Sequence, residues 1–326
     1  MKTAVVYHYY EANSKYKDNF VFFLNTAILD ELDYFIYISG TCTANLIKRK
    51  NIKYRYIENK NNDFGGLLEF NKEFKLVGFS TYIFINCSVR GPFVANYFHE
   101  KWYKIFSSKL SKDMPLVGSS INILPTSTKH SELFSKSYNF SSPYIHVQTA
   151  AYALSKKGYK ILSKCGFFDE NRQLEKNEVI CRYEILMSQI FLNKGLSIGS
   201  ILPTQEEFKG NKKYNRKLED TSNNGDLLFK SAFFGRSISP LEIVFIKTNN
   251  HTKTNDNIIS NRDLASYTFT SLSNKVSKGL LTDDGLELQE RSAQQLLREE
   301  PITLFKNPKY IFREIKRRLK KKKRHY

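Results

Sequence analysis

The run Tyr82–Ile85 (YIFI) constrains the fold more than any other part of this chain. A run this apolar does not suit a strand with one face in water, so it predicts a central strand of a parallel sheet, buried on both faces. The residues that follow are compact and polar or form turns: Asn86, Cys87, Ser88, Arg90 and Gly91. Ligands of open α/β sheets bind beyond the carboxyl ends of the strands. The sequence therefore predicts a ligand site just after this strand.

Strand-forming runs alternate with helical periodicity around it. Residues 3–10 and 33–38 favour strands, and between them the apolar positions of residues 19–30 recur at helical spacing. A third extended run covers 53–57, and a short helix is expected at 67–74. This alternation predicts an α/β fold with a mostly parallel central sheet flanked by helices on both faces.

The rest of the chain continues the pattern. Helices are expected at 93–110, 150–164 and 177–194, strands at 116–119, 144–148, 196–202 and 240–247, and a polar loop at 126–142. The Asn- and Thr-rich residues 248–261 are typical of a linker, and helical stretches follow to about residue 300. We expect a domain over 1–247, a linker and helical segment over 248–300, and a basic tail over 301–326.

Composition excludes several classes of protein. The 326 residues are 41% hydrophobic and 14% aromatic, enough for a packed core rather than a disordered chain. The four cysteines are widely spaced and form no CxxC pair, which favours neither a zinc site nor a disulfide framework and suits a reducing cytoplasm. The amino terminus has too short an apolar run for a signal peptide, and no apolar run reaches the roughly 18 residues of a membrane span.

The net charge of +19 is concentrated at the carboxyl end. Residues 306–326 carry eleven Lys and Arg against the single Glu314, and without them the excess falls to about +9, a modest basic bias. Apolar side chains lie along one helical face of this tail, at Tyr310, Ile311, Phe312, Ile315 and Leu319. Such a helix suits an anionic membrane leaflet, with each cation contributing about 1 kcal/mol. A solvated tail remains the alternative for the last seven residues.

The turn before the apolar strand carries a family resemblance. Asn59, Asp63 and the pair Gly65-Gly66, followed by a short helix and the strand 82–85, resemble the donor-binding half of nucleotide-sugar glycosyltransferases with the GT-A fold. The resemblance implies that the donor is bound by Asn59, Asp63, Asn86, Ser88 and Arg90. In that family a pair of aspartates after the strand holds a divalent metal, Mn²⁺ or Mg²⁺, and this chain has Asn86-Cys87-Ser88 there.

That departure leaves the cofactor open, because Asn and Ser replace carboxylates poorly around a hard cation. Either no metal is used and Arg90 with backbone amides neutralises the diphosphate, or the resemblance misplaces the site. A third alternative is that Arg90-Gly91-Pro92 only forms a tight turn.

A second series of motifs is similar to the rhamnan-synthesis F family of bacterial polysaccharide glycosyltransferases. The motifs are Tyr7-His8-Tyr9-Tyr10, His146-Val147-Gln148, Phe168-Asp169-Glu170 and Arg182-Tyr183-Glu184. Together with the Asn59–Gly66 turn they cover roughly residues 5–203. The likeness is to the second half of these enzymes and holds at the level of the superfamily.

Sugar transfer with inversion needs a carboxylate that takes the proton from the acceptor hydroxyl. Glu184 is the candidate base, because helical spacing places it on the same face as apolar residues, where burial would raise its pKa. The alternative is a surface Glu or one paired with Arg182. His146 could orient the acceptor or contact a phosphate, and Gln148 could bind a hydroxyl of the acceptor. Asp169 and Glu170 fit a solvated loop better.

These residues predict a glycosyltransferase that moves a sugar from a nucleotide-sugar donor to a growing surface glycan of the capsule, lipopolysaccharide or O-antigen type. Its acceptor would be a glycan or lipid-linked glycan, and its expected place is the cytoplasm, at the inner face of the cell membrane. One alternative is a non-catalytic relative that binds a sugar or nucleotide. Another is a nucleic-acid-binding protein using Lys212–Lys217 and the tail, but aromatic residues are not interleaved with these basic runs as stacking platforms require.

Overall fold

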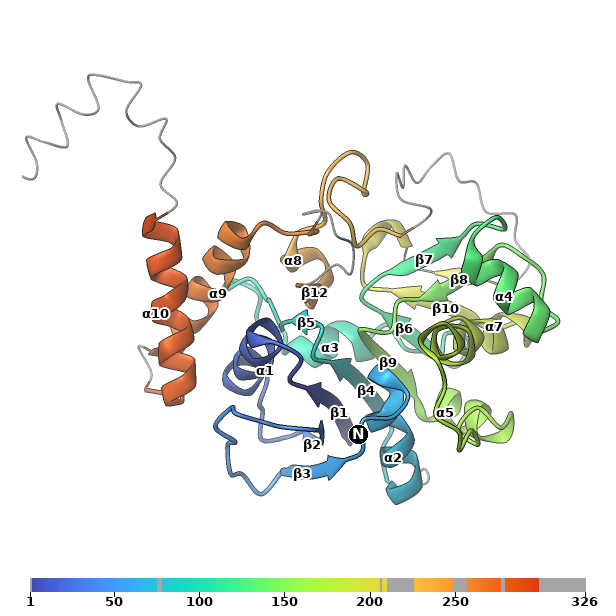
Figure 1. Ribbon diagram of the computed structural model, residues 1–326, viewed down its shortest axis with the longest axis horizontal. Coiled ribbons are helices and arrows are strands. Elements are labelled where there is room, and N and C mark those ends of the chain that lie inside the picture. Colours follow the sequence, from blue (N-terminus) through green and yellow to red (C-terminus); the bar gives the residue numbers. More distant parts are fainter. Residues whose placement is uncertain are drawn as a thin grey trace, which may run out of the picture.

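The computed structural model describes residues 2–74, 78–205, 207–209, 226–248, 257–276 and 279–298. In these ranges the chain forms an α/β fold around an eight-stranded sheet of order β11-β10-β6-β9-β4-β1-β2-β3 (Figure 1). The strands are β1 (Thr3–Tyr10), β2 (Asp33–Ser39), β3 (Ile52–Ile57), β4 (Thr81–Asn86), β6 (Leu116–Gly118), β9 (Ala151–Ser155), β10 (Ser197–Ser200) and β11 (Phe208–Lys209). Only β9 and β11 run antiparallel to their neighbours, so the predicted mostly parallel sheet is confirmed.

Two small antiparallel pairs lie beside the main sheet. Strand β5 (Val89–Arg90) pairs with β12 (Ile246–Lys247), and β7 (Ile121–Leu124) pairs with β8 (Tyr144–Val147). The first pair brings residues from the end of the 240–247 segment back to the loop that follows β4. The second pair carries the His146 motif, which thus lies on a strand as predicted.

Alternation along the strands divides the core in two. In β1, Val5, Tyr7 and Tyr9 belong to the cluster that includes residues of α1 (Ser14–Thr26), α3 (Trp102–Ser107), α9 (Asn261–Val276) and α10 (Asp283–Arg298). Ala4 and Val6 belong to the cluster that includes residues of α2 (Gly65–Phe74), α4 (Lys129–Ser137), α5 (Lys156–Lys164) and α7 (Leu186–Asn193). Each strand residue thus faces one set of helices or the other, as a period of two requires.

Several local predictions are wrong. Of the helix expected at 93–110 only Trp102–Ser107 is helical, and the residues before it form a loop in which Tyr97 is 82% exposed. The helix expected at 150–164 begins at Lys156, because Ala151–Ser155 is β9 and the side chain of Ser155 caps the helix by accepting from Gly158 N. The expected loop 126–142 contains α4, capped by Thr128.

The expected strand 240–247 is also mostly helical. Residues Pro240–Ile243 form α8, started by a capping box between Ser239 and Glu242, and only β12 at its end is extended. Capping residues set these boundaries locally, whereas hydrophobic spacing alone does not.

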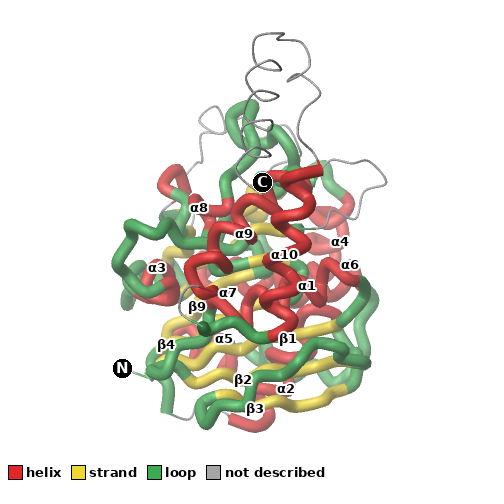
Figure 2. Tube along the Cα trace, turned by 90° about the vertical axis from the view of Figure 1, so that its left-hand side faces the viewer, coloured by secondary structure: helices red, strands yellow, loops and turns green. Residues whose placement is uncertain are grey.

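The predicted carboxyl-terminal helices are confirmed. Helices α9 and α10 lie side by side and pack against α1 (Figure 2). Leu264, Leu272 and Leu288 join the same hydrophobic cluster as α1, which ties this hairpin to the sheet. Most of the expected linker and the whole basic tail lie outside the described residues. In the described ranges no helix combines the length and apolar character needed to cross a membrane.

Candidate functional site

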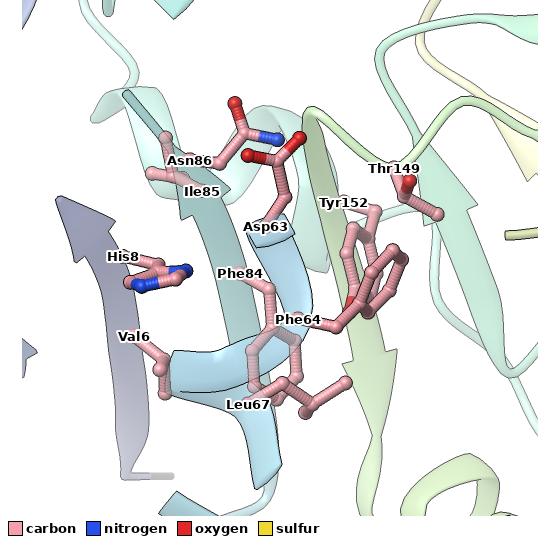
Figure 3. Close-up of a pocket in the computed structure, with 10 residues that line it drawn as sticks. All are labelled: Val6, His8, Asp63, Phe64, Leu67, Phe84, Ile85, Asn86, Thr149 and Tyr152. Carbon is pink, nitrogen blue, oxygen red and sulfur yellow. The ribbon is translucent and has the colours of Figure 1, made fainter. Parts of the chain in front are cut away.

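The carboxyl edge of the parallel strands carries a small polar cavity. His8 and Asn86 are register partners on β1 and β4 and face the same side of the sheet. With them, Asp63, Thr149 and an apolar floor that includes Phe64 and Tyr152 line the cavity (Figure 3). Its volume of about 10 Å³ holds roughly one water molecule. Any larger ligand would therefore have to lie at the mouth, next to the polar side chains of Asp63, Asn86 and Thr149.

The Gly65-Gly66 pair allows α2 to approach β1 closely. A Cβ on Gly66 would lie 3.0 Å from His8 Cβ and 3.2 Å from Tyr37 Cβ, and one on Gly65 would lie 2.6 Å from the Lys60 carbonyl oxygen. The His8 ring is fixed by Ser39, whose Oγ lies 2.8 Å from Nε2. Burial lowers the pKa of His8, against the opposing charge of Asp63. The predicted glycine turn thus allows the first residues of α2 to pack directly against His8, which is neutral, with Asp63 next to them.

Asn86 and its neighbours do not form a metal site. Asn86 Oδ1 accepts hydrogen bonds from both the backbone N and the Oγ of Ser88, and Cys87 Sγ is buried against the backbone of Tyr10. The oxygen that would replace a carboxylate is therefore already occupied. In the part of the chain that the structure describes, no three His, Cys, Asp or Glu side chains are grouped to hold an ion. The donor set here does not fit Mn²⁺ or Mg²⁺.

Arg90 lies away from the cavity, on the α1 side of the molecule. Its Nε donates to Asn19 Oδ1 at 2.9 Å, its Nη1 donates to Thr268 Oγ1 at 3.1 Å, and its Nη2 lies 3.7 Å from Asp18 Oδ2. The side chain is almost fully buried, and burial lowers its pKa to about 10. Arg90 thus joins α1, β5 and α9 and is not among the residues that line the cavity.

Asn59 is also outside the cavity, exposed in the loop after β3. Its neighbour Asn61 organises this loop, because the Asn61 amide accepts from Leu174 N at 2.8 Å and donates to the Arg172 carbonyl at 3.2 Å. These bonds hold the Asp63 turn against the segment that leads into the next helices.

Glu184 lies on a local π-helical turn, Ile180–Ile185, between α6 (Lys176–Val179) and α7. Single π turns inside α-helices are frequent at functional sites. The turn is anchored on both sides of Glu184. Tyr183 stacks on Phe64 with ring centroids 5.0 Å apart, and Arg182 Nη2 donates to the Gly166 carbonyl at 2.9 Å. The Tyr183–Phe64 contact joins this helix directly to the Asp63 turn.

The pKa of Glu184 is raised to about 7, mainly by burial. Lys247 opposes this rise, the negative charges of Asp226 and Asp63 add to it, and a hydrogen bond with Thr149 opposes it. The side chain as a whole retains 24% of its surface exposed, so Glu184 is largely buried but not sealed from solvent. A carboxyl group with a pKa near neutrality is suited to general-base work.

Gln148 fixes the position of Asp226, whose negative charge acts on Glu184. Its Nε2 donates to Asp226 Oδ1 at 2.7 Å, and its Oε1 accepts from Ser120 Oγ at 2.6 Å. With both ends engaged and the side chain buried, Gln148 positions a carboxylate and does not offer a free amide to a ligand. The predicted contact with an acceptor hydroxyl would require one of these bonds to break.

His146 faces Glu184 from β8. Its Nε2 lies 3.7 Å from Glu184 Oε1, and its Nδ1 lies 3.1 Å from the Tyr144 carbonyl. Since the carbonyl only accepts, Nδ1 carries the proton and Nε2 turns a lone pair toward Glu184. Burial lowers the pKa of His146 to about 4, so the ring is neutral at physiological pH. Ser188 and Gln189 of α7 fix this strand by bonding Val147 N and the Ile145 carbonyl.

The structure thus groups most of the predicted residues at one edge: Asp63, Asn86 with Ser88, His146, Gln148 and Glu184. It does not bring Asn59 or Arg90 there. The sequence interpretation missed Thr149, Asp226 and Lys247. Thr149 directly follows the His146-Val147-Gln148 motif and could have been included, whereas Asp226 and Lys247 stand in segments without a recognisable motif and reach the site only through the fold.

Comparison with known proteins gives distant likeness only. No protein-family model and no curated protein matches the sequence. Among solved structures, the galactosyltransferase LgtC with donor and acceptor sugar analogs is 10% identical, with a TM-score of 0.32 over 56% of this chain and 70% of LgtC. The bifunctional glycosyltransferase WbbM is 10% identical, with a TM-score of 0.30 over 60% of this chain and 37% of WbbM.

A third structure covers more of the chain. The mannosyltransferase PcManGT of Pyrobaculum calidifontis, with GDP-mannose and Mn²⁺, is 9% identical, with a TM-score of 0.32 over 90% of this chain and 69% of PcManGT. None of these matches assigns the chain to the rhamnan-synthesis F family. The chain is distantly similar in structure to glycosyltransferases.

Proposed function

We propose that this protein transfers a sugar from a nucleotide-sugar donor to a hydroxyl of a glycan acceptor, with Glu184 as the general base. The observation that carries the proposal is the setting of Glu184: a carboxyl group on a π turn, with a pKa raised to about 7, at the carboxyl edge of the sheet. Enzymes tune carboxylates in this way to accept a proton near neutral pH.

In the proposed reaction, Glu184 removes the proton of the acceptor hydroxyl as its oxygen bonds to the anomeric carbon. The bond from that carbon to the donor phosphate breaks, and the nucleoside diphosphate leaves with its electron pair. Asp63, Asn86 and Thr149 at the cavity mouth would contact the sugar. Lys247, which interacts electrostatically with Glu184, stabilises the carboxylate form of the base and so favours proton removal near neutral pH.

His146 and Gln148 act as positioning residues in this proposal. The neutral His146 ring packs next to Glu184, and Gln148 holds the Asp226 carboxylate that raises the Glu184 pKa. The mechanism contains no metal step, because the occupied Asn86 oxygen and the neighbouring groups do not fit a divalent cation.

The acceptor would be a growing surface glycan of the capsule, lipopolysaccharide or O-antigen type, free or lipid-linked. The basic tail of residues 306–326 would hold the protein at the anionic inner face of the cell membrane, where such acceptors are extended.

A second candidate is a non-catalytic sugar- or nucleotide-binding protein. The specific observation in its favour is that Asn86 Oδ1 accepts two hydrogen bonds from Ser88. Asn86 and Ser88 stand where a metal-binding pair of carboxylates would be expected, and they do not supply metal ligands. Such a protein would bind a nucleoside diphosphate but show no turnover.

The test combines binding and turnover. Calorimetry with UDP and dTDP, with and without Mn²⁺, measures donor-side affinity, and release of the diphosphate from the matching nucleotide-sugars measures activity. Glu184→Gln should keep the affinity but lower turnover about 10²-fold or more, whereas Glu132→Gln on exposed α4 should change neither. Equal turnover of Glu184→Gln and the parent would show that Glu184 is not the general base. The absence of binding heat with any nucleoside diphosphate would show that the protein does not use a nucleotide-sugar donor.

A further inference from the structure

A cavity of about 460 Å³ lies outside the Glu184 site, between residues 237–240 and the beginning of α9. Its size falls within the range of pockets that bind small ligands. The lining residues are Lys230, Ser237, Ile238, Ser239, Pro240, Asn257, Ile258, Ile259, Ser260, Asn261, Asp263 and Tyr267. No residue of the Glu184 site contributes to it.

The lining combines an apolar floor with a rim of short polar groups. Ile238, Ile258 and Ile259 are buried side chains, and Pro240 extends this apolar surface. Around them the rim presents hydroxyl, amide, carboxylate and ammonium groups. The side chains of Lys230 and Asn261 are exposed at this rim, and neither makes a hydrogen bond or ion pair with another side chain of the described residues.

The walls are held in place before any ligand arrives. Ser239 Oγ and Tyr267 OH lie 3.1 Å apart and join the two walls across the cavity. Ser239 N also donates to Glu242, which accepts two further hydrogen bonds from Arg236, each at 2.7 Å. A preformed cavity loses less free energy on binding than one that must be ordered by its ligand.

The cavity is also close in sequence to the site. Ser239 and Pro240 start α8, and a few residues later β12 presents Lys247, whose charge acts on Glu184. Ser239 and Pro240 in the cavity wall and Lys247 near Glu184 therefore belong to one short, well-packed segment.

We propose that this cavity binds a neutral saccharide of one or two rings, as a subsite for part of a glycan beyond the sugar that reacts. A sugar ring has an apolar CH face and a circumference of hydroxyls, which matches an isoleucine floor inside a rim of hydroxyl and amide groups. A nucleoside diphosphate fits poorly, because among the described residues that line the cavity there is one lysine, no arginine for phosphates and a single aromatic ring, Tyr267. The biological sense of the subsite rests on the proposed sugar transfer, but its binding does not require turnover.

The experiment uses the full chain with ¹³C-labelled isoleucine methyl groups, titrated with lactose, maltose and cellobiose. The methyl signals of Ile238, Ile258 and Ile259 should shift on titration, while those of Ile83 and Ile85 in β4 should not. The double variant Lys230→Ala/Asn261→Ala should weaken binding about tenfold or more, the scale of two lost hydrogen bonds. Lys160→Ala/Asn193→Ala, at exposed positions elsewhere, is the matched control and should bind as the parent does.

The outcomes separate this inference from the proposed function. Methyl shifts together with a complete lack of sugar transfer would support the saccharide subsite and contradict the proposed sugar transfer. Sugar transfer without methyl shifts for any of the three disaccharides would contradict the subsite and support the proposed transfer. Shifts that the Lys230/Asn261 double variant leaves unchanged would also contradict the subsite. A melting temperature measured for each variant excludes loss of fold as the cause.

Discussion

His146 Nε2 lies 3.7 Å from Glu184 Oε1, yet the two groups do not form an ion pair at any pH. His146 is charged only below its lowered pKa of about 4, and Glu184 is charged only above its raised pKa of about 7. Between these values both are neutral. Burial is the first cause of both shifts, and it favours the uncharged form of each group. The contact is therefore that of a neutral ring beside a carboxyl group that gains its charge near neutral pH.

The neighbours of Glu184 should move its pKa in opposite directions. Asp226→Asn removes a negative charge that raises the pKa, so the Glu184 pKa should fall. Lys247→Met removes a positive charge that lowers the pKa, so it should rise. The carboxyl carbon of Glu184, followed by NMR from pH 4 to 9, measures both shifts directly, and the acid side of any pH–rate profile should move with them.

The remaining groups around Glu184 provide the controls. Asp63, His146, Thr149 and Tyr152 also surround Glu184 and are unchanged in both variants. Lys160→Met, at an exposed position of α5, removes a lysine at a distance and should leave the titration in place. A shift of the same sign in both variants would mean that rearrangement, and not charge, controls the pKa.

The sequence predicts β1 to β4 and the mostly parallel sheet, because buried runs such as Tyr82–Ile85 suit a central strand, but it misses β9, which lies in a segment expected to be helical. It also predicts that Glu184 lies on an apolar helical face, and the structure finds its side chain partly buried there, while its role as base stays a prediction. It misplaces Arg90, because proximity to Asn86 in sequence does not reveal which helices the side chain will meet. In the structure Arg90 lies against α1 and α9. Asp226 and Lys247 depend on long-range packing that no local pattern encodes.

Glu184→Gln should make the protein more stable at alkaline pH. The folded-state pKa of about 7 exceeds the ordinary value of 4.5, so the folded state holds the proton more tightly than the unfolded state. Stability contributed by the neutral carboxyl is therefore complete below pH 4.5 and is lost as pH rises to 7. At pH 8 the variant should gain up to about 3 kcal/mol relative to the parent. Denaturant unfolding at pH 4 and pH 8 measures the difference.

A control for this prediction comes from His146, whose linkage has the opposite sign. Its lowered pKa gives stability that is present above pH 6.5 and lost as pH falls toward 4. Because both proteins retain His146, its effect cancels in the comparison. An equal pH dependence of the parent and Glu184→Gln would show that Glu184 titrates normally.

Gly118→Ala should destabilise the fold through a single contact. A Cβ on Gly118 would lie 2.2 Å from Val147 Cγ1, and Val147 is fully buried. We expect a loss of about 1–3 kcal/mol from this overpacking. Val147→Ala should rescue part of it, because it removes the clashing methyl group. A double-mutant cycle by thermal unfolding gives the coupling, and additive effects of the two changes would contradict the close approach of β6 and β8.

Arg90→Met should cost stability rather than ligand affinity. The change leaves Asn19 and Thr268 without their guanidinium donor, while Asp18 keeps Arg291 at 2.8 Å. Breaking a buried charge network of this kind costs about 3 kcal/mol. The control Arg55→Met removes an exposed pairing with Glu73 at 3.6 Å and should cost less than about 1 kcal/mol. If the Arg90→Met protein is stable but binds nucleoside diphosphates more weakly, Arg90 is a ligand-binding residue and not a structural one.

Truncation after Lys306 should abolish most binding to anionic vesicles while leaving nucleotide binding intact. The truncation removes ten Lys and Arg, which carry much of the excess positive charge, and the apolar spacing of Ile311, Ile315 and Leu319 suits a helix lying in a leaflet. Since screening acts over about 8 Å at physiological ionic strength, added salt should also weaken binding of the intact chain. Replacing these three apolar residues by serine keeps the charge and tests the apolar face separately. Co-sedimentation with neutral and anionic vesicles decides the matter: equal pelleting of the intact and truncated proteins, or unfolding of the truncated one, would assign the tail to another partner or to the core.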